Sequence, residues 1–240
     1  VMIHVVWDWN GTLVEDLPVV VESVNAALGA IGEAPITEDD YRACFTRPVG
    51  QFYERLLERS VSAPEWDTLD RVFHDQYRAA LDRVPLTADA VEAIDAVRTR
   101  GWSQSILSMW WEDELVDVVA RHGLIDSMAL VQGNVDDPGG EKASHLLRHV
   151  STLDVDVGSV VMIGDSTDDA VAAGVVGTAC VLYDGGSHHL DDLEDLGLPV
   201  SGSLVGAVRI ASQLERHPEE GARRSLRLPP KASGPRDSGP

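Results

Sequence analysis

Two segments of this sequence place carboxylates directly after apolar runs, where they could act as a nucleophile or hold a metal. Asp8 follows the run VVW, and Asn10 and Gly11 come next; Asp165 follows the run VVMIG, and Asp169 lies four positions further on. Short apolar runs with such flanks are typical of buried strands. Because ligands bind at the carboxyl ends of strands in open parallel sheets, the two segments predict one site to which both strand ends contribute.

The dipeptide Asn10-Gly11 also permits a simpler interpretation, because it often forms the turn of a β-hairpin. The residues that follow argue against a second strand, since apolar side chains between Leu17 and Ile31 recur at helical spacing. Other acidic pairs lack the strand context and are typical of solvated faces or helix caps; these are Asp39-Asp40, Asp136-Asp137 and Asp191-Asp192.

Two further residues are candidates because of their positions. Ser108 lies near the end of the apolar run SILSM, although a serine there is by itself typical of an ordinary strand end. Lys142 opens a predicted helix, where a cation opposes the helix dipole and is mildly unfavourable without a partner. Since the only other lysine is Lys231, this placement indicates a role for Lys142.

In this order the four segments resemble the motifs of the haloacid dehalogenase-like (HAD) hydrolase superfamily, in particular its phosphoglycolate-phosphatase-like subgroup with a helical cap. The family's first motif is an aspartate, any residue, usually a second aspartate, then Gly-Thr. Its second is an apolar strand ending in Ser or Thr, its third a lone lysine opening a helix, and its fourth Gly-Asp with another acid four positions on. The resemblance covers roughly residues 5–213. It implies an α/β fold, a Rossmann-like parallel sheet core with an inserted helical cap.

The resemblance implies a phosphatase in which Asp8 attacks phosphorus and forms an aspartyl-phosphate. Ser108 and Lys142 would hold the remaining phosphoryl oxygens and balance the charge that develops there. Mg²⁺ is the implied cofactor, because the available ligands are hard oxygens. Its implied ligands are the carboxylates of Asp8 and Asp165 and the backbone carbonyl of Asn10, with Asp169 supporting them from the next layer.

One position departs from the family pattern. HAD phosphatases usually carry an aspartate two positions after the nucleophile, which protonates the leaving group and later activates water, whereas this chain has Asn10. Asparagine exchanges no proton at neutral pH, and losing general acid–base catalysis costs about a hundredfold to ten-thousandfold in rate. We therefore expect a slower phosphatase, least impaired on activated substrates. The alternative is a catalytically impaired HAD-like domain that binds a phosphorylated ligand or a protein partner.

Two related activities fit less well. Phosphonoacetaldehyde hydrolases resemble the first motif in having a tryptophan after the nucleophile, but they need a Schiff-base lysine in the cap, and residues 1–141 contain no lysine. Haloacid dehalogenases also lack the second aspartate, yet the acids at Asp165 and Asp169 indicate a cation site.

Substrate-binding residues are predicted beside the motifs. Arg47 lies in a loop between predicted cap helices, where family members often place residues that contact substrate; the alternative is a solvated arginine. Met109 and Trp110 follow the second motif. Trp110 could stack on a ring or sugar, although packing beneath the cap is the simpler interpretation. His188, in a glycine-rich loop, is expected at the surface.

The resemblance and the hydrophobic pattern divide the chain into three parts. Residues 1–14 and 86–217 form the predicted HAD-like core, residues 15–85 the helical cap, and residues 218–240 a disordered tail. The cap is predicted as helices over 17–31, 37–45, 51–59 and 64–82. Beyond residue 86 we predict alternating elements, as in parallel α/β sheets: a helix to Arg100, a strand to Ser108, a helix to His122, a strand to Val131, a helix from Glu141, a strand to Ile163, a helix to Gly174 and a strand to Leu182.

Composition limits the classes of function. The chain has 240 residues and a formal net charge of −21, which argues against nucleic acid as a partner because such binding depends on basic residues. The same charge repels phosphorylated metabolites, so a phosphatase must offset it locally with a divalent cation and Lys142. No apolar run is long enough to cross a bilayer, and the first residues enter a predicted strand without the basic and apolar regions expected of a signal peptide. We therefore expect a cytoplasmic enzyme that acts on a small phosphorylated metabolite, without a membrane partner.

Overall fold

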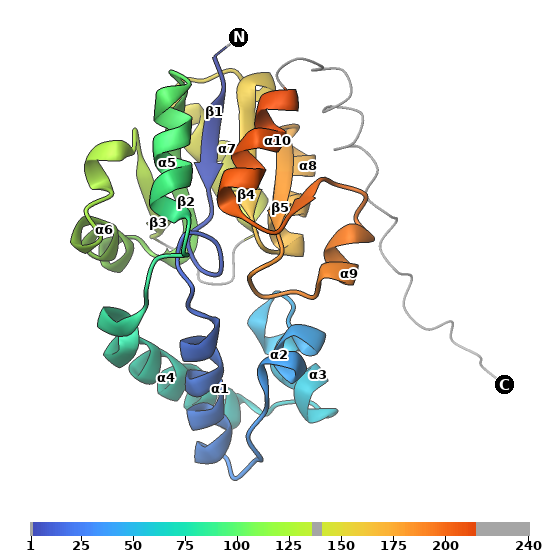
Figure 1. Cartoon of the computed structure of the whole chain (residues 1–240). Coiled ribbons are helices and arrows are strands. Elements are labelled where there is room, and N and C mark those ends of the chain that lie inside the picture. The colour runs from blue at the N-terminus through green and yellow to red at the C-terminus, as the bar shows by residue number, and fades with distance from the viewer. Residues whose placement is uncertain (1, 136–140, 215–240) are drawn as a thin grey trace, which may run out of the picture.

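The computed structural model of the protein describes residues 2–135 and 141–214, and its centre is a six-stranded parallel sheet (Figure 1). The strand order is β3-β2-β1-β4-β5-β6. The strands that carry the two acidic segments, β1 and β4, are direct neighbours, with Trp7 opposite Ile163. The strands are β1 (His4–Trp7), β2 (Ser103–Trp111), β3 (Val131–Asn134), β4 (Val160–Gly164), β5 (Ala179–Tyr183) and β6 (Val200–Ser201).

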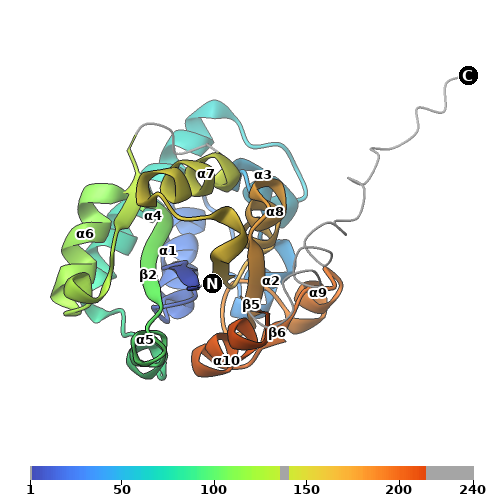
Figure 2. The same ribbon diagram turned by 90° about the horizontal axis from the view of Figure 1, so that it is seen from above.

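Helices cover both faces of this sheet, α5 and α10 on one side and α7 and α8 on the other (Figure 2). Val5 and Trp7 pack in one apolar cluster and Val6 in a second, on the opposite face. Burial on both faces explains why β1 is an apolar run rather than an alternating one. The helices are α5 (Ala90–Thr99), α6 (Glu112–Arg121), α7 (Lys142–Leu153), α8 (Thr167–Val176), α9 (Leu190–Glu194) and α10 (Leu204–Leu214).

Four of the five α-helices between β1 and β2 lie together beyond the carboxyl edge of the sheet, in the position expected of a cap (Figure 1). They have an apolar cluster of their own, which includes Leu28, Phe52 and Leu69. The edge of the sheet where β1 and β4 end therefore faces the cap. The four are α1 (Leu17–Ala30), α2 (Glu38–Cys44), α3 (Val49–Leu57) and α4 (Ala63–Ala80).

The predicted helices and most predicted strands are confirmed, with ends that differ by a few residues. The helix predicted from Thr37 begins at Glu38, because Thr37 is its N-cap and forms a capping box with Asp40. No hairpin follows β1 among the described residues. Gly11 instead takes a left-handed turn, with φ of 72°, that leads toward α1.

One strand was wrongly placed by the sequence pattern. The strand predicted to end at Val131 begins there and runs to Asn134, after a 3₁₀ turn at Ile125–Ser127. Its sequence, VQGN, is too polar to be recognised as a buried run. Gly133 passes so close to the backbone of Glu112 that a Cβ atom would clash there. The position of β3 is therefore determined by its pairing and close backbone packing rather than by hydrophobic side chains. Elements α9, β6 and α10 were not predicted. The predicted tail, 218–240, lies outside the described residues.

A buried hydrogen-bonded chain crosses the middle of the core. Ser105 Oγ lies 2.7 Å from His4 Nε2 and 2.7 Å from His149 Nε2, and His149 Nδ1 lies 2.9 Å from Gln132 Oε1. Burial lowers the pKa of His149 to about 3.

Among the helices of residues 2–135 and 141–214, we find none that combines the length and the apolar composition that a membrane span requires.

Candidate active site

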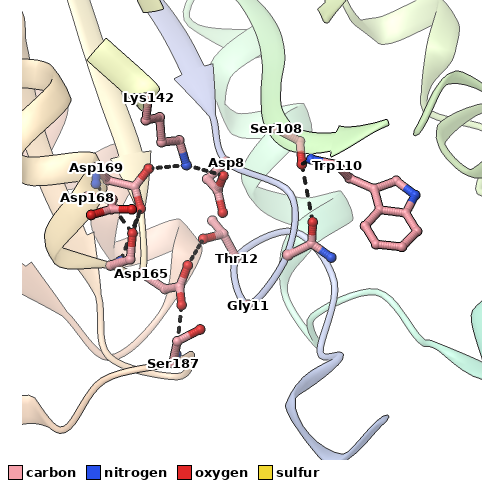
Figure 3. Close-up of polar contacts among 12 residues, drawn as sticks. Asp8, Gly11, Thr12, Ser108, Trp110, Lys142, Asp165, Asp168, Asp169 and Ser187 are labelled. Atoms are coloured by element: carbon pink, nitrogen blue, oxygen red, sulfur yellow. Dashed lines mark hydrogen bonds and ion pairs between the residues drawn. The ribbon is translucent and has the colours of Figure 1, made fainter. Parts of the chain in front are cut away.

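Three buried carboxylates meet where β1 and β4 end (Figure 3). Asp8 directly follows β1, and its backbone N–H donates to the carbonyl of Ile163 at 2.8 Å. Asp165 directly follows β4, and Asp169 lies in the first turn of α8. One oxygen from each carboxylate lies within 4.8 Å of the other two. The two acidic segments thus form one cluster, because parallel strands end at the same edge.

Lys142 lies between two of these carboxylates, as Figure 3 shows. Its ammonium Nζ pairs with Asp169 Oδ1 at 2.5 Å and with Asp8 Oδ1. Burial alone would lower the pKa of Lys142, but the two adjacent carboxylates outweigh it and raise that pKa above its ordinary value. These contacts explain why a cation is tolerated as the first residue of α7, where it opposes the helix dipole.

Asp169 is fixed by the start of its own helix. Ser166 is the N-cap of α8, and Asp169 Oδ2 accepts from the backbone N–H of Ser166 at 3.0 Å and from its hydroxyl at 2.6 Å. This capping box uses one oxygen and turns the other toward Lys142. The acid four positions after Asp165 is therefore also a structural element of the turn.

Asp165 is held by groups that the sequence did not indicate. Thr12 Oγ1 donates to Asp165 Oδ1 at 3.2 Å, and the backbone N–H of Ser187 donates to Oδ2 at 2.7 Å. A Cβ atom on Gly11 or Gly186 would collide with this carboxylate. Burial, with a contribution from Asp169, raises the pKa of Asp165 to about 6. In the sequence, the glycine pair Gly185-Gly186 after β5 was the feature that could have indicated this close contact with Asp165.

Asn10 and Ser108 are brought together across β1 and β2. Ser108 Oγ donates to Asn10 Oδ1 at 3.2 Å and accepts from the backbone N–H of Trp110 at 3.0 Å. The amide of Asn10 binds two residues that sequence reasoning missed, Asp16 at 2.8 Å and Tyr77 at 2.7 Å. Neither belongs to a motif, and they lie six and 67 positions along the chain from Asn10.

The predicted substrate-binding residues lie in the loop between α2 and α3 and in strand β2. Arg47 forms an ion pair with Asp168 Oδ2 at 3.3 Å, so its guanidinium is turned toward the core in this structure. Met109 is half-buried in β2. The ring of Trp110 packs 4.8 Å from that of Tyr77, beneath α4. His188, expected at the surface, is buried, because its ring packs against Phe45 of the cap, with centroids 5.5 Å apart.

The carboxylate cluster fits a hard divalent cation. Asp8, Asp165 and Asp169 offer only oxygen donors, which suits Mg²⁺ better than zinc. When ionised, three buried carboxylates against one ammonium leave two negative charges uncompensated, and burying unpaired charge is costly. Burial also raises the pKa of Asp8 well above its ordinary value, although Lys142 opposes that shift. A divalent cation would neutralise the excess charge.

A family model described as haloacid dehalogenase-like hydrolase matches residues 3–177. The chain belongs to this family. The HAD resemblance inferred from the motifs is thereby confirmed, and the parallel sheet agrees with it.

Curated relatives agree with this assignment, and a solved structure has a similar fold. The chain is 29% identical over 174 residues to "Phosphoglycolate phosphatase, plasmid" of Cupriavidus necator, covering 71% of this chain and 75% of that protein. It is 28% identical over 180 residues to a phosphoglycolate phosphatase of Synechococcus elongatus, covering 74% and 81%. A predicted phosphatase from Clostridium acetobutylicum has a similar fold, with a TM-score of 0.79 at 13% identity, covering 89% of this chain and all of that chain.

Proposed function

We propose that this HAD hydrolase is a Mg²⁺-dependent phosphatase that hydrolyses a small phosphorylated metabolite through an aspartyl-phosphate on Asp8. The observation that carries the proposal is the buried cluster in which Asp8 meets Lys142, Asp165 and Asp169. A nucleophilic carboxylate beside a fixed cation is what phosphoryl transfer through a covalent intermediate requires. The relatives named phosphoglycolate phosphatases support a small phosphorylated substrate.

In the proposed reaction an oxygen of Asp8 attacks phosphorus while the bond from phosphorus to the leaving oxygen breaks. Lys142 holds Oδ1 of Asp8, which leaves Oδ2 for the attack. Water then attacks the phosphorus of the aspartyl-phosphate, so that inorganic phosphate leaves and the carboxylate is restored. Lys142 stabilises charge on the phosphoryl oxygens, and Ser108 is the proposed donor to another of them.

The cation is assigned to the same cluster. Asp8, Asp165 and the backbone carbonyl of Asn10 are its proposed ligands, and Asp169 orients Lys142 from behind. When bound, Mg²⁺ would neutralise part of the phosphoryl charge and orient the group for attack. Thr12 and Ser187 prepare the site by holding both oxygens of Asp165.

The second candidate function is a HAD-like domain that binds a phosphorylated ligand or a protein partner without turnover. One observation favours it. The residue in the position of the family's proton donor is Asn10, and both hydrogens of its amide are bound to other side chains. Retention of Asp8, Lys142 and both acids of the fourth motif favours turnover.

Phosphate release from p-nitrophenyl phosphate, with Mg²⁺ and with excess EDTA, separates the two functions. We expect release with Mg²⁺ that is lost in EDTA and lost in Asp8→Asn, which keeps the side-chain shape. The matched control is Asp67→Asn, which changes an exposed aspartate of the cap and should leave the rate unchanged. The second candidate function predicts a different result. Phosphorylated ligands would raise the melting temperature, which reports binding, but the protein would release phosphate from none of them.

A further inference from the structure

The side chain of Asn10 is oriented by its hydrogen bonds. Its amide Nδ2 donates one hydrogen to Asp16 Oδ2 at 2.8 Å and the other to the hydroxyl of Tyr77 at 2.7 Å. A primary amide has two hydrogens, so both are used. The carbonyl Oδ1 is turned the other way and accepts from Ser108. Toward Ser108, Asn10 thus presents a hydrogen-bond acceptor and no donor.

Asp16 determines which way this amide faces. Asp16 is 2% exposed, and its carboxylate accepts from the backbone N–H of Gly11 at 2.7 Å and from the hydroxyl of Tyr77 at 2.7 Å, besides the amide of Asn10. An ionised carboxylate only accepts hydrogen bonds, so the carbonyl of Asn10 cannot face it. Asp16 is the N-cap residue of α1, yet its side chain makes no capping bond to that helix. The carboxylate serves the Asn10 turn instead.

Tyr77 connects the same amide to the cap. It lies in the last turns of α4 and is buried against Trp110 of β2, with ring centroids 4.8 Å apart. Asp16 directly precedes α1, the first helix of the cap, and Tyr77 lies in the last turn of α4, the last helix of the cap. The chain passes between sheet and cap at the start of α1 and at the end of α4 (Figure 1). The orientation of the Asn10 amide therefore depends on residues at both chain connections between the sheet and the cap.

We propose that Asp16 and Tyr77 are positioning residues that hold the carbonyl of Asn10 toward the reacting atoms, and that the site consequently selects phosphoryl groups whose leaving oxygen departs without a proton. This inference rests on the proposed phosphatase function. Asp8 forms its bond to phosphorus, the bond from phosphorus to the leaving oxygen breaks, and the electron pair stays on that oxygen.

The chemistry of the leaving group then defines the substrate class. An acyl phosphate leaves as a carboxylate and a nitrophenyl phosphate as a phenolate, and both are stable without a proton at neutral pH. An ordinary alkyl phosphate leaves as an alkoxide, which needs a donor that the amide of Asn10 does not offer. The substrate class is therefore acyl phosphates and similarly activated phosphates.

The first test compares acetyl phosphate, p-nitrophenyl phosphate and phosphoglycolate as substrates of the full chain with Mg²⁺. We expect kcat/KM on the two activated phosphates to exceed that on phosphoglycolate by about a hundredfold or more, the scale of missing acid catalysis. Equal rates on all three would overturn the selectivity while leaving the phosphatase function intact. No hydrolysis of any of them would contradict the phosphatase function itself.

The second test replaces the positioning residues. In Asp16→Asn the new amide can donate to the carbonyl of Asn10, whose own amide hydrogens then turn toward the site. There they can donate a hydrogen bond to the leaving oxygen without transferring a proton, so selectivity for acetyl phosphate over phosphoglycolate should fall by about tenfold or more. Tyr77→Phe frees one amide hydrogen and should move the selectivity in the same direction. The matched control is Tyr53→Phe, which removes the hydroxyl of another buried cap tyrosine and should leave selectivity unchanged.

These variants keep the inference testable if one of them unfolds. Melting temperatures identify a variant that does not fold, and the selectivity of the other variant then tests the positioning role. A merely structural role would lower the rate on all substrates by the same factor. Unchanged selectivity in a folded Asp16→Asn or Tyr77→Phe, or an equal change in Tyr53→Phe, would overturn the assignment.

Discussion

Replacing Asn10 by aspartate puts the usual family residue at this position, but the structure predicts that this change alone destabilises the protein. The amide nitrogen of Asn10 lies 2.8 Å from Asp16 Oδ2. In Asn10→Asp a carboxylate oxygen would take its place and face another buried carboxylate. Two such charges about 4 Å apart repel by about 4 kcal/mol at an effective dielectric constant of 20. That energy corresponds to about three pKa units, so the pair would retain a proton.

The sign of the pH dependence follows from this retained proton. The folded variant holds a proton between about pH 4 and pH 7 that the unfolded chain has released, so its free energy of unfolding falls as the pH rises through that window. We expect Asn10→Asp to melt close to the parent protein at pH 4 to 5. At pH 8 it should melt roughly 10 °C lower, since each kcal/mol shifts the melting temperature by about 2–4 °C in a chain of this size.

The double variant, Asn10→Asp with Asp16→Asn, exchanges the two groups and should remove the penalty. The amide at position 16 can donate to the carboxylate at position 10, and the hydroxyl of Tyr77 can bind both, so every hydrogen bond has a counterpart. The parent melting temperature should return at pH 8. The new acid should also raise the rate on phosphoglycolate, within the hundredfold to ten-thousandfold scale of general acid catalysis.

Melting curves at pH 5 and pH 8 and phosphate release from phosphoglycolate and p-nitrophenyl phosphate provide the measurements. Asp16→Asn alone is the control for the loss of the original carboxylate. The reasoning is refuted if Asn10→Asp melts like the parent protein at pH 8. It is also refuted if the double variant is stable but no faster on phosphoglycolate than the parent.

Three further predictions follow from the site and the core. Asp8→Asn should lower kcat on the order of ten-thousandfold or more while the melting temperature stays near that of the parent, and a smaller loss would contradict its role as nucleophile. Gly186→Ala should displace Asp165, because the added Cβ atom would collide with its carboxylate, and should raise the Mg²⁺ concentration for half-maximal rate by about tenfold. Gly202→Ala, where the added Cβ atom meets only ordinary contacts, should leave that concentration unchanged, and equal behaviour of the two variants would exclude this crowding effect. Because the pKa of folded His149 is lowered to about 3, the unfolded chain binds the extra proton below pH 6.5, so stability should fall as the pH drops from 6.5 toward 3, by about 1.4 kcal/mol per unit from this residue. Acid denaturation of His149→Gln should show a shallower decline, and an identical pH profile would refute the assignment.

Local pattern was sufficient for much of the fold. Buried parallel strands are apolar on both faces, so β1 and β4 are visible as runs, and the helices of the cap show their apolar stripes and capping residues. The strand β3 is the exception, because its residues are polar and its position is set by pairing with β2.

The residues at the ends of β1 and β4 could be identified from local pattern, because each strand and the turn that follows it are formed by neighbouring residues. The contacts that those residues make depend on the packing of distant segments. Lys142 meets Asp8 across 134 positions of chain, Tyr77 meets Asn10 across 67, and Ser187 meets Asp165 across 22. Contacts of this kind depend on how helices and loops pack at the edge of the sheet, and no spacing rule in a single sequence encodes them. The position of Asn10 could therefore be found in the sequence, whereas the orientation of its amide depends on a carboxylate and a hydroxyl that folding brings to it.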